Sequence, residues 1–240
     1  MIPALADVRD IDAELGFFLP CLNEAQSIGP VVTSLRRRFA GATIVVVDDG
    51  SLDDTAKVAA EAGAFVARMS TNMGIATACL AGLACCRELG CKRIVRLDGD
   101  GQHAVDDVVR LLSVGDADLV VGSRYIGGDR YTSLMRGVGI GVLRLAFRIL
   151  HRRHVSDPTS GFRAYSARVA DFLLASPYPV DYPEPEEVAA VLSSRQFTLA
   201  EVAVEVRARA HGASTITSAR SVYFMVKVCI ALILRRALLL

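Results

Sequence analysis

The stretch Ile94-Val95-Arg96-Leu97-Asp98-Gly99-Asp100-Gly101-Gln102-His103 decides the fold, because a short apolar run ends there on two closely spaced carboxylates. Apolar, β-branched residues bounded by glycines predict a buried strand. In an open α/β sheet, ligands gather at the carboxyl ends of strands, so Asp98, Asp100 and Gln102 are expected at a binding edge. Two carboxylates and an amide oxygen suit Mg²⁺ or Mn²⁺ bridging a diphosphate.

Two other interpretations of this stretch compete with a diphosphate site. A calcium loop of the EF-hand type would need a glycine at the position of His103 and a glutamate at that of Val109, so it is rejected. A solvated, aspartate-rich turn would account for the stretch taken alone. The rest of the chain favours the binding site.

The composition is that of a globular protein with room for one large domain or two small ones, since 52% of the 240 residues are hydrophobic and 22% are charged. A net charge of +1 gives no global argument for nucleic-acid binding. The six cysteines form no CxxC pair and lie in apolar segments, which indicates buried thiols in a reducing cytoplasm. Residues 1–13 carry charges throughout, so no signal peptide is expected there.

Apolar runs alternate with helical patterns through the first half of the chain. Besides the run before Asp98, strands are expected at Leu15–Pro20, Thr43–Val47, Ala64–Arg68 and Asp118–Gly122. Helices are expected at Ser27–Phe39 (with Ser27 as the cap), from Asp53 onward, at Ile75–Leu89 and at Ala104–Leu112. This alternation predicts an α/β fold with a doubly wound, mostly parallel sheet flanked by helices.

The second half is more basic and more apolar. Arg136, Arg144 and Arg148 interrupt an apolar run over Leu134–Leu150, and residues 151–154 extend the basic cluster. Further on we expect a strand around Ala164–Tyr165, helices at Ala167–Ala175 and from Tyr182 to Leu192, and an exposed strand over Ala200–Val206.

The C-terminal stretch Ser221–Leu240 is very apolar, but its longest charge-free run near the end, Val228–Leu234, has only seven residues. A membrane-spanning helix needs about 20 mostly apolar residues. We therefore expect an amphipathic helix at a membrane interface, with a partner-binding helix and a core helix as the alternatives.

Five motifs in order carry a family resemblance. They are Pro20-Cys-Leu-Asn-Glu24, Val47-Asp-Asp-Gly-Ser-Leu-Asp-Asp-Thr55, Asn72-Met-Gly74, Asp98-Gly-Asp-Gly-Gln102 and Gly122-Ser-Arg-Tyr125. Together they resemble a glycosyltransferase of family 2, with the GT-A fold, over about residues 15–216. Asp157-Pro-Thr-Ser-Gly-Phe-Arg-Ala-Tyr165 and Arg209-x-x-Gly212-x-Ser214 are similar to the dolichol- and polyprenyl-phosphate mannosyltransferase branch.

The resemblance implies a domain organisation. A single GT-A catalytic domain would span 1–216, with a nucleotide-sugar half over about 15–125 and an acceptor half over about 126–216. Residues 217–240 would form the apolar, basic C-terminal helix.

The resemblance also implies roles for individual residues. A nucleotide-sugar site would be lined by Pro20, Leu22, Glu24, Val47, Asp49, Asp98, Gly99, Arg209 and Ser214. Asp98, Asp100 and Gln102 would hold the metal, Asp100 and Arg124 would be catalytic, and Arg124 with Arg136 would bind the acceptor phosphate. Arginine suits the acceptor role because its planar fork matches a phosphate.

Two departures from that branch leave the acceptor and the sugar open. Thr215 stands where the branch usually has lysine, and Tyr182-Pro-Glu-Pro-Glu-Glu187 replaces a Gln…Glu pattern. A lipid phosphate is already anionic and needs no general base, so direct in-line attack would invert the anomeric carbon. A sugar hydroxyl would need a base, for which Glu184, Glu186 and Glu187 are candidates, with an acidic helix N-terminus as the alternative.

Three functions follow as hypotheses. The first is a metal-dependent, inverting hexosyltransferase acting on a polyprenyl or dolichyl phosphate. The second is a transferase that acts on a sugar hydroxyl in a cell-surface glycan, and the third is a non-catalytic nucleotide-sugar binder. We expect UDP-, GDP- or dTDP-sugar as donor, Mg²⁺ or Mn²⁺ as cofactor, no nucleic acid, a cytoplasmic location at the inner face of a membrane, and an apolar end that allows homodimers.

Overall fold

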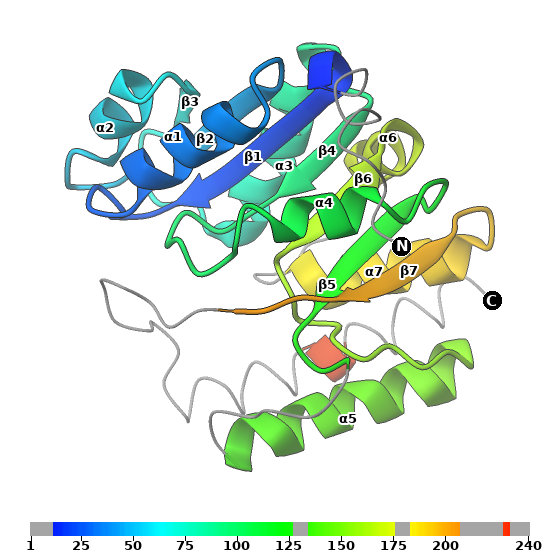
Figure 1. The fold of residues 1–240 in the computed structure, drawn as a ribbon. Coiled ribbons are helices and arrows are strands. Elements are labelled where there is room, and N and C mark those ends of the chain that lie inside the picture. Colours follow the sequence, from blue (N-terminus) through cyan, green and yellow to red (C-terminus); the bar gives the residue numbers. More distant parts are fainter. Residues whose placement is uncertain (1–11, 127–133, 176–182, 207–227, 231–240) are drawn as a thin grey trace.

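The computed structural model describes residues 12–126, 134–175, 183–206 and 228–230, and these form a mixed sheet with helices on both faces (Figure 1). The strands are β1 (Leu15–Cys21), β2 (Thr43–Asp48), β3 (Phe65–Arg68), β4 (Arg93–Arg96), β5 (Leu119–Ser123), β6 (Arg163–Ser166) and β7 (Leu199–Ala203). The helices are η1 (Asp12–Glu14), α1 (Ile28–Arg38), α2 (Thr55–Glu61), α3 (Ile75–Glu88), α4 (Asp107–Leu112), α5 (Leu134–His151), α6 (Ala167–Ala175) and α7 (Pro183–Ser194). The expected α/β class is confirmed.

The strands lie in the order β3-β2-β1-β4-β6-β5-β7. β1 pairs in parallel with β2 and β4, β2 with β3, and β5 with β7. β6 is antiparallel to both β4 and β5. The mostly parallel sheet is therefore confirmed, and the loops after β1, β2 and β4 all leave from one edge, where ligands of such sheets bind.

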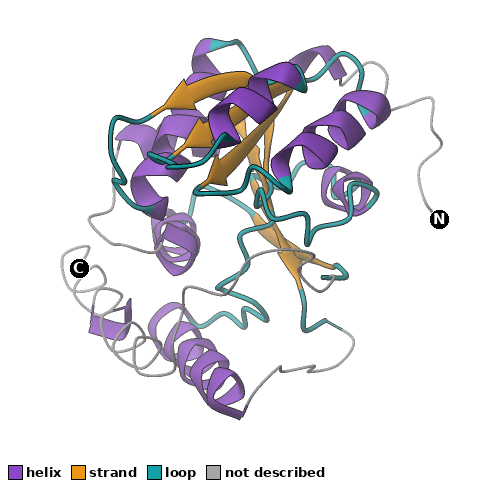
Figure 2. Ribbon diagram, turned by 90° about the vertical axis from the view of Figure 1, so that its left-hand side faces the viewer, coloured by secondary structure: helices purple, strands orange, loops and turns teal. Residues whose placement is uncertain are grey.

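Both faces of the sheet are covered, as Figure 2 shows in the view turned by 90°. On β1, Phe17 and Leu19 pack in the core on the side of α1, whereas Phe18 packs on the side of α3. This two-residue period is what a strand buried on both faces requires. The small residues of α3 let it approach closely, because a Cβ at Gly82 would collide with the Phe18 ring.

Several predicted boundaries shift. β1 continues through Pro20 to Cys21, α1 ends at Arg38, and α4 begins at Asp107, three residues later than expected. Ser27 occupies the N-cap of α1, but its hydroxyl makes no cap hydrogen bond and donates to the Glu24 carboxylate instead, so the expected capping contact is wrong. β7 is half-buried along most of its length because it pairs with β5, which corrects the exposed strand that was expected there.

Helix α5 lies beyond β5 and β7, at the bottom of Figure 1. Across the described part of the chain, no helix is both long and apolar enough to cross a membrane. The predicted C-terminal helix falls outside the described residues except for 228–230, which are helical.

Candidate functional site

The first two motif loops meet at the carboxyl edge of the sheet. Pro20 pairs with Val47 in the β1–β2 ladder, and the Asp49 amide donates to the Cys21 carbonyl at 2.9 Å. Leu22 follows with 38% of its surface exposed. The sequence therefore correctly predicts that these positions lie together.

Side chains of the second loop hold the backbone of the first. Ser51 Oγ accepts the Asn23 amide at 2.9 Å, Thr55 Oγ1 accepts the Glu24 amide at 2.8 Å, and Asp53 Oδ2 accepts the Ala25 amide at 3.1 Å. In return Asn23 Oδ1 accepts the Leu52 amide, and Asn23 itself has a φ of +57°. The sequence predicted these residues only as parts of the motifs and gave them no role in holding the two loops together. Their positions directly after neighbouring strands could have indicated such contacts.

Asp49 holds a third loop in place. Its two carboxylate oxygens accept the backbone amides of Met73 and Gly74 at 2.7 and 2.9 Å. Its neighbour Asp48 is fully buried, accepts the Ser51 amide and lies 3.2 Å from Arg68 Nε. Asp49 thus joins the Asn72-Met73-Gly74 motif to the predicted nucleotide edge, a connection that the sequence did not predict.

The acidic motif follows β4 as a tight loop. Gly99 is required there because a Cβ would collide with the Cys21 sulfur, and Gly101 adopts a φ of +73° that favours glycine. Asp100 is buried, and its Oδ1 accepts the Gln102 amide at 3.0 Å. Asp98 is the more accessible carboxylate, with 40% of its side chain exposed.

An arginine and a histidine lie beside Asp98. Arg96 Nη2 lies 3.7 Å from Asp98 Oδ1, and His103 Nε2 lies 3.5 Å from Oδ2 while its ring stacks on Phe162. Partial burial raises the pKa of the Asp98 carboxyl, but the His103 hydrogen bond and the charges of Arg96, His103 and Arg124 outweigh it, so the pKa lies well below the usual range. Asp98 therefore remains an anion at neutral pH.

The acidic loop fits a hard divalent cation that shares its ligands with a substrate diphosphate. Within the described residues, no group of three or more His, Cys, Asp or Glu side chains could hold a metal alone. Mg²⁺ characteristically binds through one or two carboxylates, with substrate phosphates and water completing the shell. Asp98, anionic and accessible, suits that use. Gln102 contributes a main-chain contact here, and its predicted ligand role stays a prediction.

Arg124, which is predicted to bind the acceptor phosphate, lies directly after β5. Its Nε and Nη2 donate to the two oxygens of Asp157 at 2.7 and 2.8 Å, and Nη2 also donates to Thr159 Oγ1 at 2.8 Å. Burial lowers the pKa of the guanidinium, but the Asp157 hydrogen bonds and charge dominate and raise it above the usual value. Asp157 thus fixes the plane of the Arg124 guanidinium, and 28% of the Arg124 side chain remains exposed.

The loop that carries Asp157 also contacts the acidic motif. A Cβ at Gly161 would lie 3.0 Å from Asp98 Oδ1 and 3.1 Å from Arg96 Nη2. The Asp157–Arg163 segment therefore packs directly against the predicted metal site. A side chain at Gly161 would require Asp98 or Arg96 to shift by a few tenths of an ångström, which favours glycine at this position.

The glutamates proposed as general bases lie on α7 and are buried. Glu184 Oε1 accepts Arg96 Nη2 at 2.6 Å, and Glu187 Oε2 accepts both Arg163 Nη1 at 3.0 Å and the Tyr165 hydroxyl at 2.8 Å. Glu186 is 3% exposed. The alternative of an acidic helix N-terminus is confirmed, because Glu184 and Glu186 lie in the first turn of α7, and that turn is buried.

Three predicted residues cannot be placed. Arg209 and Ser214 lie outside the described residues. Arg136 falls within α5, but only its backbone is described.

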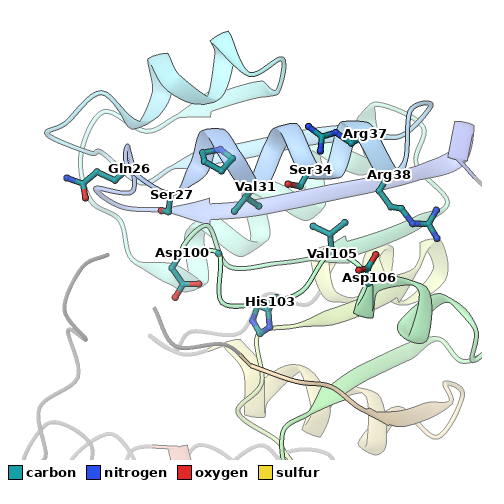
Figure 3. Close-up of a pocket in the computed structure, with 12 residues that line it drawn as sticks. Gln26, Ser27, Val31, Ser34, Arg37, Arg38, Asp100, His103, Val105 and Asp106 are labelled. Carbon is teal, nitrogen blue, oxygen red and sulfur yellow. The ribbon is translucent and has the colours of Figure 1, made fainter. Parts of the chain in front are cut away.

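A hollow of about 620 Å³ lies between α1 and the loop 100–106 (Figure 3). Asp100 and His103 border it on one side, and Gln26 and Ser27, just before α1, and Val31, on α1, border it on the other. Of the predicted site residues that the structure describes, only Asp100 borders this hollow, so the hollow flanks the predicted nucleotide edge without coinciding with it.

Comparison with known proteins identifies the family. The sequence profile described as glycosyl transferase family 2 matches residues 17–173. The chain belongs to this family. As a family 2 glycosyltransferase, it uses a nucleotide sugar.

Two relatives illustrate the range of similarity. The UDP-N-acetylglucosamine–dolichyl-phosphate N-acetylglucosaminyltransferase of Methanococcus voltae is 27% identical over 216 residues, which cover 81% of this chain and 86% of that protein. The polyprenol monophosphomannose synthase of Mycolicibacterium smegmatis is 32% identical over 163 residues, covering 64% and 62%. The second alignment thus spans less than two thirds of that relative.

Solved structures share the fold. The glucosyl-3-phosphoglycerate synthase of Mycobacterium tuberculosis, in complex with Mn²⁺, uridine diphosphate and phosphoglyceric acid, has a TM-score of 0.71 at 22% identity. The match covers 97% of this chain and 82% of that one. At this identity the likeness establishes the GT-A architecture alone, and the same synthase has also been solved with Mg²⁺.

Proposed function

We propose that this family 2 glycosyltransferase transfers a hexosyl group from a nucleotide-diphosphate sugar to a lipid-linked phosphate, with inversion at the anomeric carbon. The observation that carries the proposal is the Arg124–Asp157 pair. It holds a partly exposed guanidinium group next to Asp98, against which the loop of Asp157 packs. A planar fork of this kind recognises a phosphate better than a single ammonium does. Both relatives support the same acceptor class, since one is a dolichyl-phosphate N-acetylglucosaminyltransferase and the other a polyprenol monophosphomannose synthase.

The engaged glutamates also favour an acceptor that needs no base. Glu184 and Glu187 each accept a hydrogen bond from a buried arginine, so both carboxylates are already engaged within the protein. A sugar hydroxyl would require a free base near the reacting carbon. A phosphate monoester is already anionic at neutral pH, so it can attack the anomeric carbon without a general base.

The proposed mechanism assigns each group a task. The loops after β1, β2 and β3, clamped to one another, orient the nucleotide, and Asp98 with Asp100 would hold Mg²⁺ or Mn²⁺. When bound, this cation would stabilise the negative charge that develops on the departing nucleoside diphosphate. Arg124 orients the acceptor phosphate for attack on the anomeric carbon. The acceptor oxygen forms the new C–O bond as the bond to the diphosphate breaks.

The organisation of the chain is part of this proposal. The nucleotide-sugar half is assigned to about 15–125 and the acceptor half to about 126–216. A lipid-linked acceptor also implies that the enzyme works beside a membrane, at its cytoplasmic face.

A release assay tests the proposal. The full chain with Mn²⁺ or Mg²⁺ is given UDP-, GDP- and dTDP-sugars, with and without a short polyprenyl phosphate. We expect nucleoside diphosphate release that requires the metal, one donor and the lipid phosphate, and that falls at least ~1,000-fold in Asp98→Asn. The matched variant Asp116→Asn, at an exposed aspartate before β5, should retain activity.

Other outcomes would separate the alternatives. Donor hydrolysis that ignores the lipid phosphate would point to a glycan hydroxyl as acceptor. Donor binding measured by calorimetry without any release would leave a nucleotide-sugar binder. Either result would overturn the acceptor assignment.

A further inference from the structure

Helix α5 is apolar on two opposite faces. Its inner face places Ile140, Leu143 and Phe147 against the body of the protein, each no more than 5% exposed. Its outer face carries four large aliphatic side chains, exposed by 59%, 44%, 57% and 68%: Val138, Val142, Leu145 and Ile149. A helix that is apolar around most of its surface needs a second apolar environment.

The four outer residues form one continuous stripe. Their spacings along the chain place them one above another on the same face of the helix. Isolated exposed aliphatic residues are common on soluble proteins, but a contiguous row marks a contact surface. We call these four residues the outer stripe.

Charge around the outer stripe distinguishes between possible contacts. Four basic side chains are exposed at the C-terminal end of α5 or directly after it: Arg148, Arg152, Arg153 and His154. Residues 134–154 include no aspartate or glutamate. A second copy of the chain would bring its own arginines against these, whereas anionic lipid headgroups would neutralise them.

The helix is connected to the predicted acceptor site at its C-terminal end and through its side chains. Arg144 Nε donates to the Ser156 carbonyl at 2.8 Å, and its guanidinium lies 5.1 Å from the centre of the Tyr125 ring. Tyr125 follows Arg124 in the chain, and Ser156 precedes Asp157, the partner of Arg124. A surface that holds α5 therefore sets the position of the Arg124–Asp157 pair.

We propose that α5 is an interfacial helix that inserts its outer stripe into an anionic lipid surface, with the arginines at its C-terminal end among the headgroups. The docking would bring the Arg124–Asp157 pair to the level of a lipid-linked phosphate, and in that respect it rests on the proposed function. The docking itself does not depend on the acceptor, since the contact is made by aliphatic side chains and headgroup charge.

Vesicle flotation tests the surface without donor or acceptor. The full chain is mixed with phosphatidylcholine vesicles that contain or lack phosphatidylglycerol. We expect binding that needs the anionic lipid, weakens with salt, and falls roughly 100-fold in the double variant Leu145→Glu/Ile149→Glu. Leu89→Glu, at a 48% exposed leucine after α3, is the matched control and should bind as the unaltered chain does.

The absence of tryptophan from the sequence allows a second measurement. Leu145→Trp introduces a single fluorophore on the outer stripe, and Leu89→Trp introduces one on the distant control site. With anionic vesicles we expect a blue shift and quenching by brominated acyl chains for Leu145→Trp alone. This variant keeps the stripe apolar, so it reports insertion even if the double glutamate variant folds poorly.

Three results would overturn the proposal. They are no vesicle binding by the unaltered chain, equal binding by the stripe and control variants, and a dimer, detected by sedimentation, that the stripe variant dissociates. Such a dimer would mean that the outer stripe contacts a second copy of the chain. Failure of the proposed function would look different, because the release assay would find no lipid-phosphate dependence while stripe-dependent flotation persisted.

Discussion

The proposed nucleotide edge and the proposed acceptor side of this glycosyltransferase are built from different interactions. At the nucleotide edge, side chains such as Ser51, Thr55 and Asp49 accept backbone amides of neighbouring loops. On the acceptor side, arginines pair with carboxylates: Arg96 with Glu184, Arg124 with Asp157 and Arg163 with Glu187. The first region fixes the course of the backbone, and the second fixes charged side chains inside the protein.

This difference has an energetic consequence. A hydrogen bond to a loop amide contributes about 1 kcal/mol and can be replaced by water when the loop is near the surface. Breaking a buried ion pair leaves an uncompensated charge and costs roughly 3–5 kcal/mol. Substitutions at the nucleotide edge should therefore mainly weaken donor binding. Substitutions on the acceptor side should also lower the free energy of unfolding.

The largest effect is expected from Glu187→Leu. Glu187 and Arg163 are both fully buried, so the substitution leaves the arginine without its counter-charge and removes the acceptor of the Tyr165 hydroxyl. We expect the free energy of unfolding to fall by roughly 3–5 kcal/mol, measured by urea denaturation. The double variant Arg163→Met/Glu187→Leu should recover much of that loss. Equal destabilisation in both variants would show that packing, and not charge, holds α7 to β6.

Arg124→Lys separates charge from geometry on the acceptor side. A lysine keeps the positive charge but cannot donate to both Asp157 oxygens and to Thr159 as the guanidinium does. We expect KM for the lipid phosphate to rise roughly 10- to 100-fold, with KM for the donor nearly unchanged, in steady-state release assays. An equal rise in both values would place Arg124 at the donor, contrary to its assignment.

Asp49→Ala makes the complementary change at the nucleotide edge. It removes the acceptor of the Met73 and Gly74 amides and loosens the loop before α3. We expect KM for the nucleotide sugar to rise about 10-fold while the midpoint of urea unfolding changes little. If KM for the lipid phosphate rises instead, the division into two halves is wrong.

The motif spacing correctly predicted which loops lie together, because the contacts between these loops are local to strand ends. Parallel strands bring the residues after β1, β2 and β4 to one edge, so Pro20, Val47 and Asp98 could be placed together from pattern alone. The direction of β6 could not be predicted, since a short apolar run has the same two-residue period in either orientation.

The ion pairs of the acceptor side were beyond sequence reasoning. Arg96 and Glu184 are 88 positions apart, and nothing in either local pattern indicates that they meet. Glu184 and Glu187 instead had the features of a helix N-terminus, where acids are common. Their burial comes from tertiary packing of α7 against α3, α5, α6 and β7, which no local pattern encodes.

Asp118→Asn provides a reference for both regions, because Asp118 precedes β5 at the edge opposite the site. Its carboxylate accepts the Ser166 hydroxyl at 2.9 Å and the Thr198 amide at 3.0 Å, linking β5 to β6 and β7. Burial raises the pKa of this carboxyl, but the hydrogen bonds from Thr198 and Ser166 lower it further, so its pKa is below the usual value.

A depressed carboxyl pKa stabilises the fold above the unfolded value of about 4, and this contribution is lost as the pH falls through the folded value. Asp118→Asn should therefore lower the free energy of unfolding by about 1 kcal/mol at pH 7, and the difference from the unaltered chain should shrink as the pH falls below about 4. Urea denaturation at a series of pH values measures both. If the difference in the free energy of unfolding stays constant with pH, the charge of Asp118 does not contribute to stability. The acceptor-side pairs would then be the better test of how charge stabilises this fold.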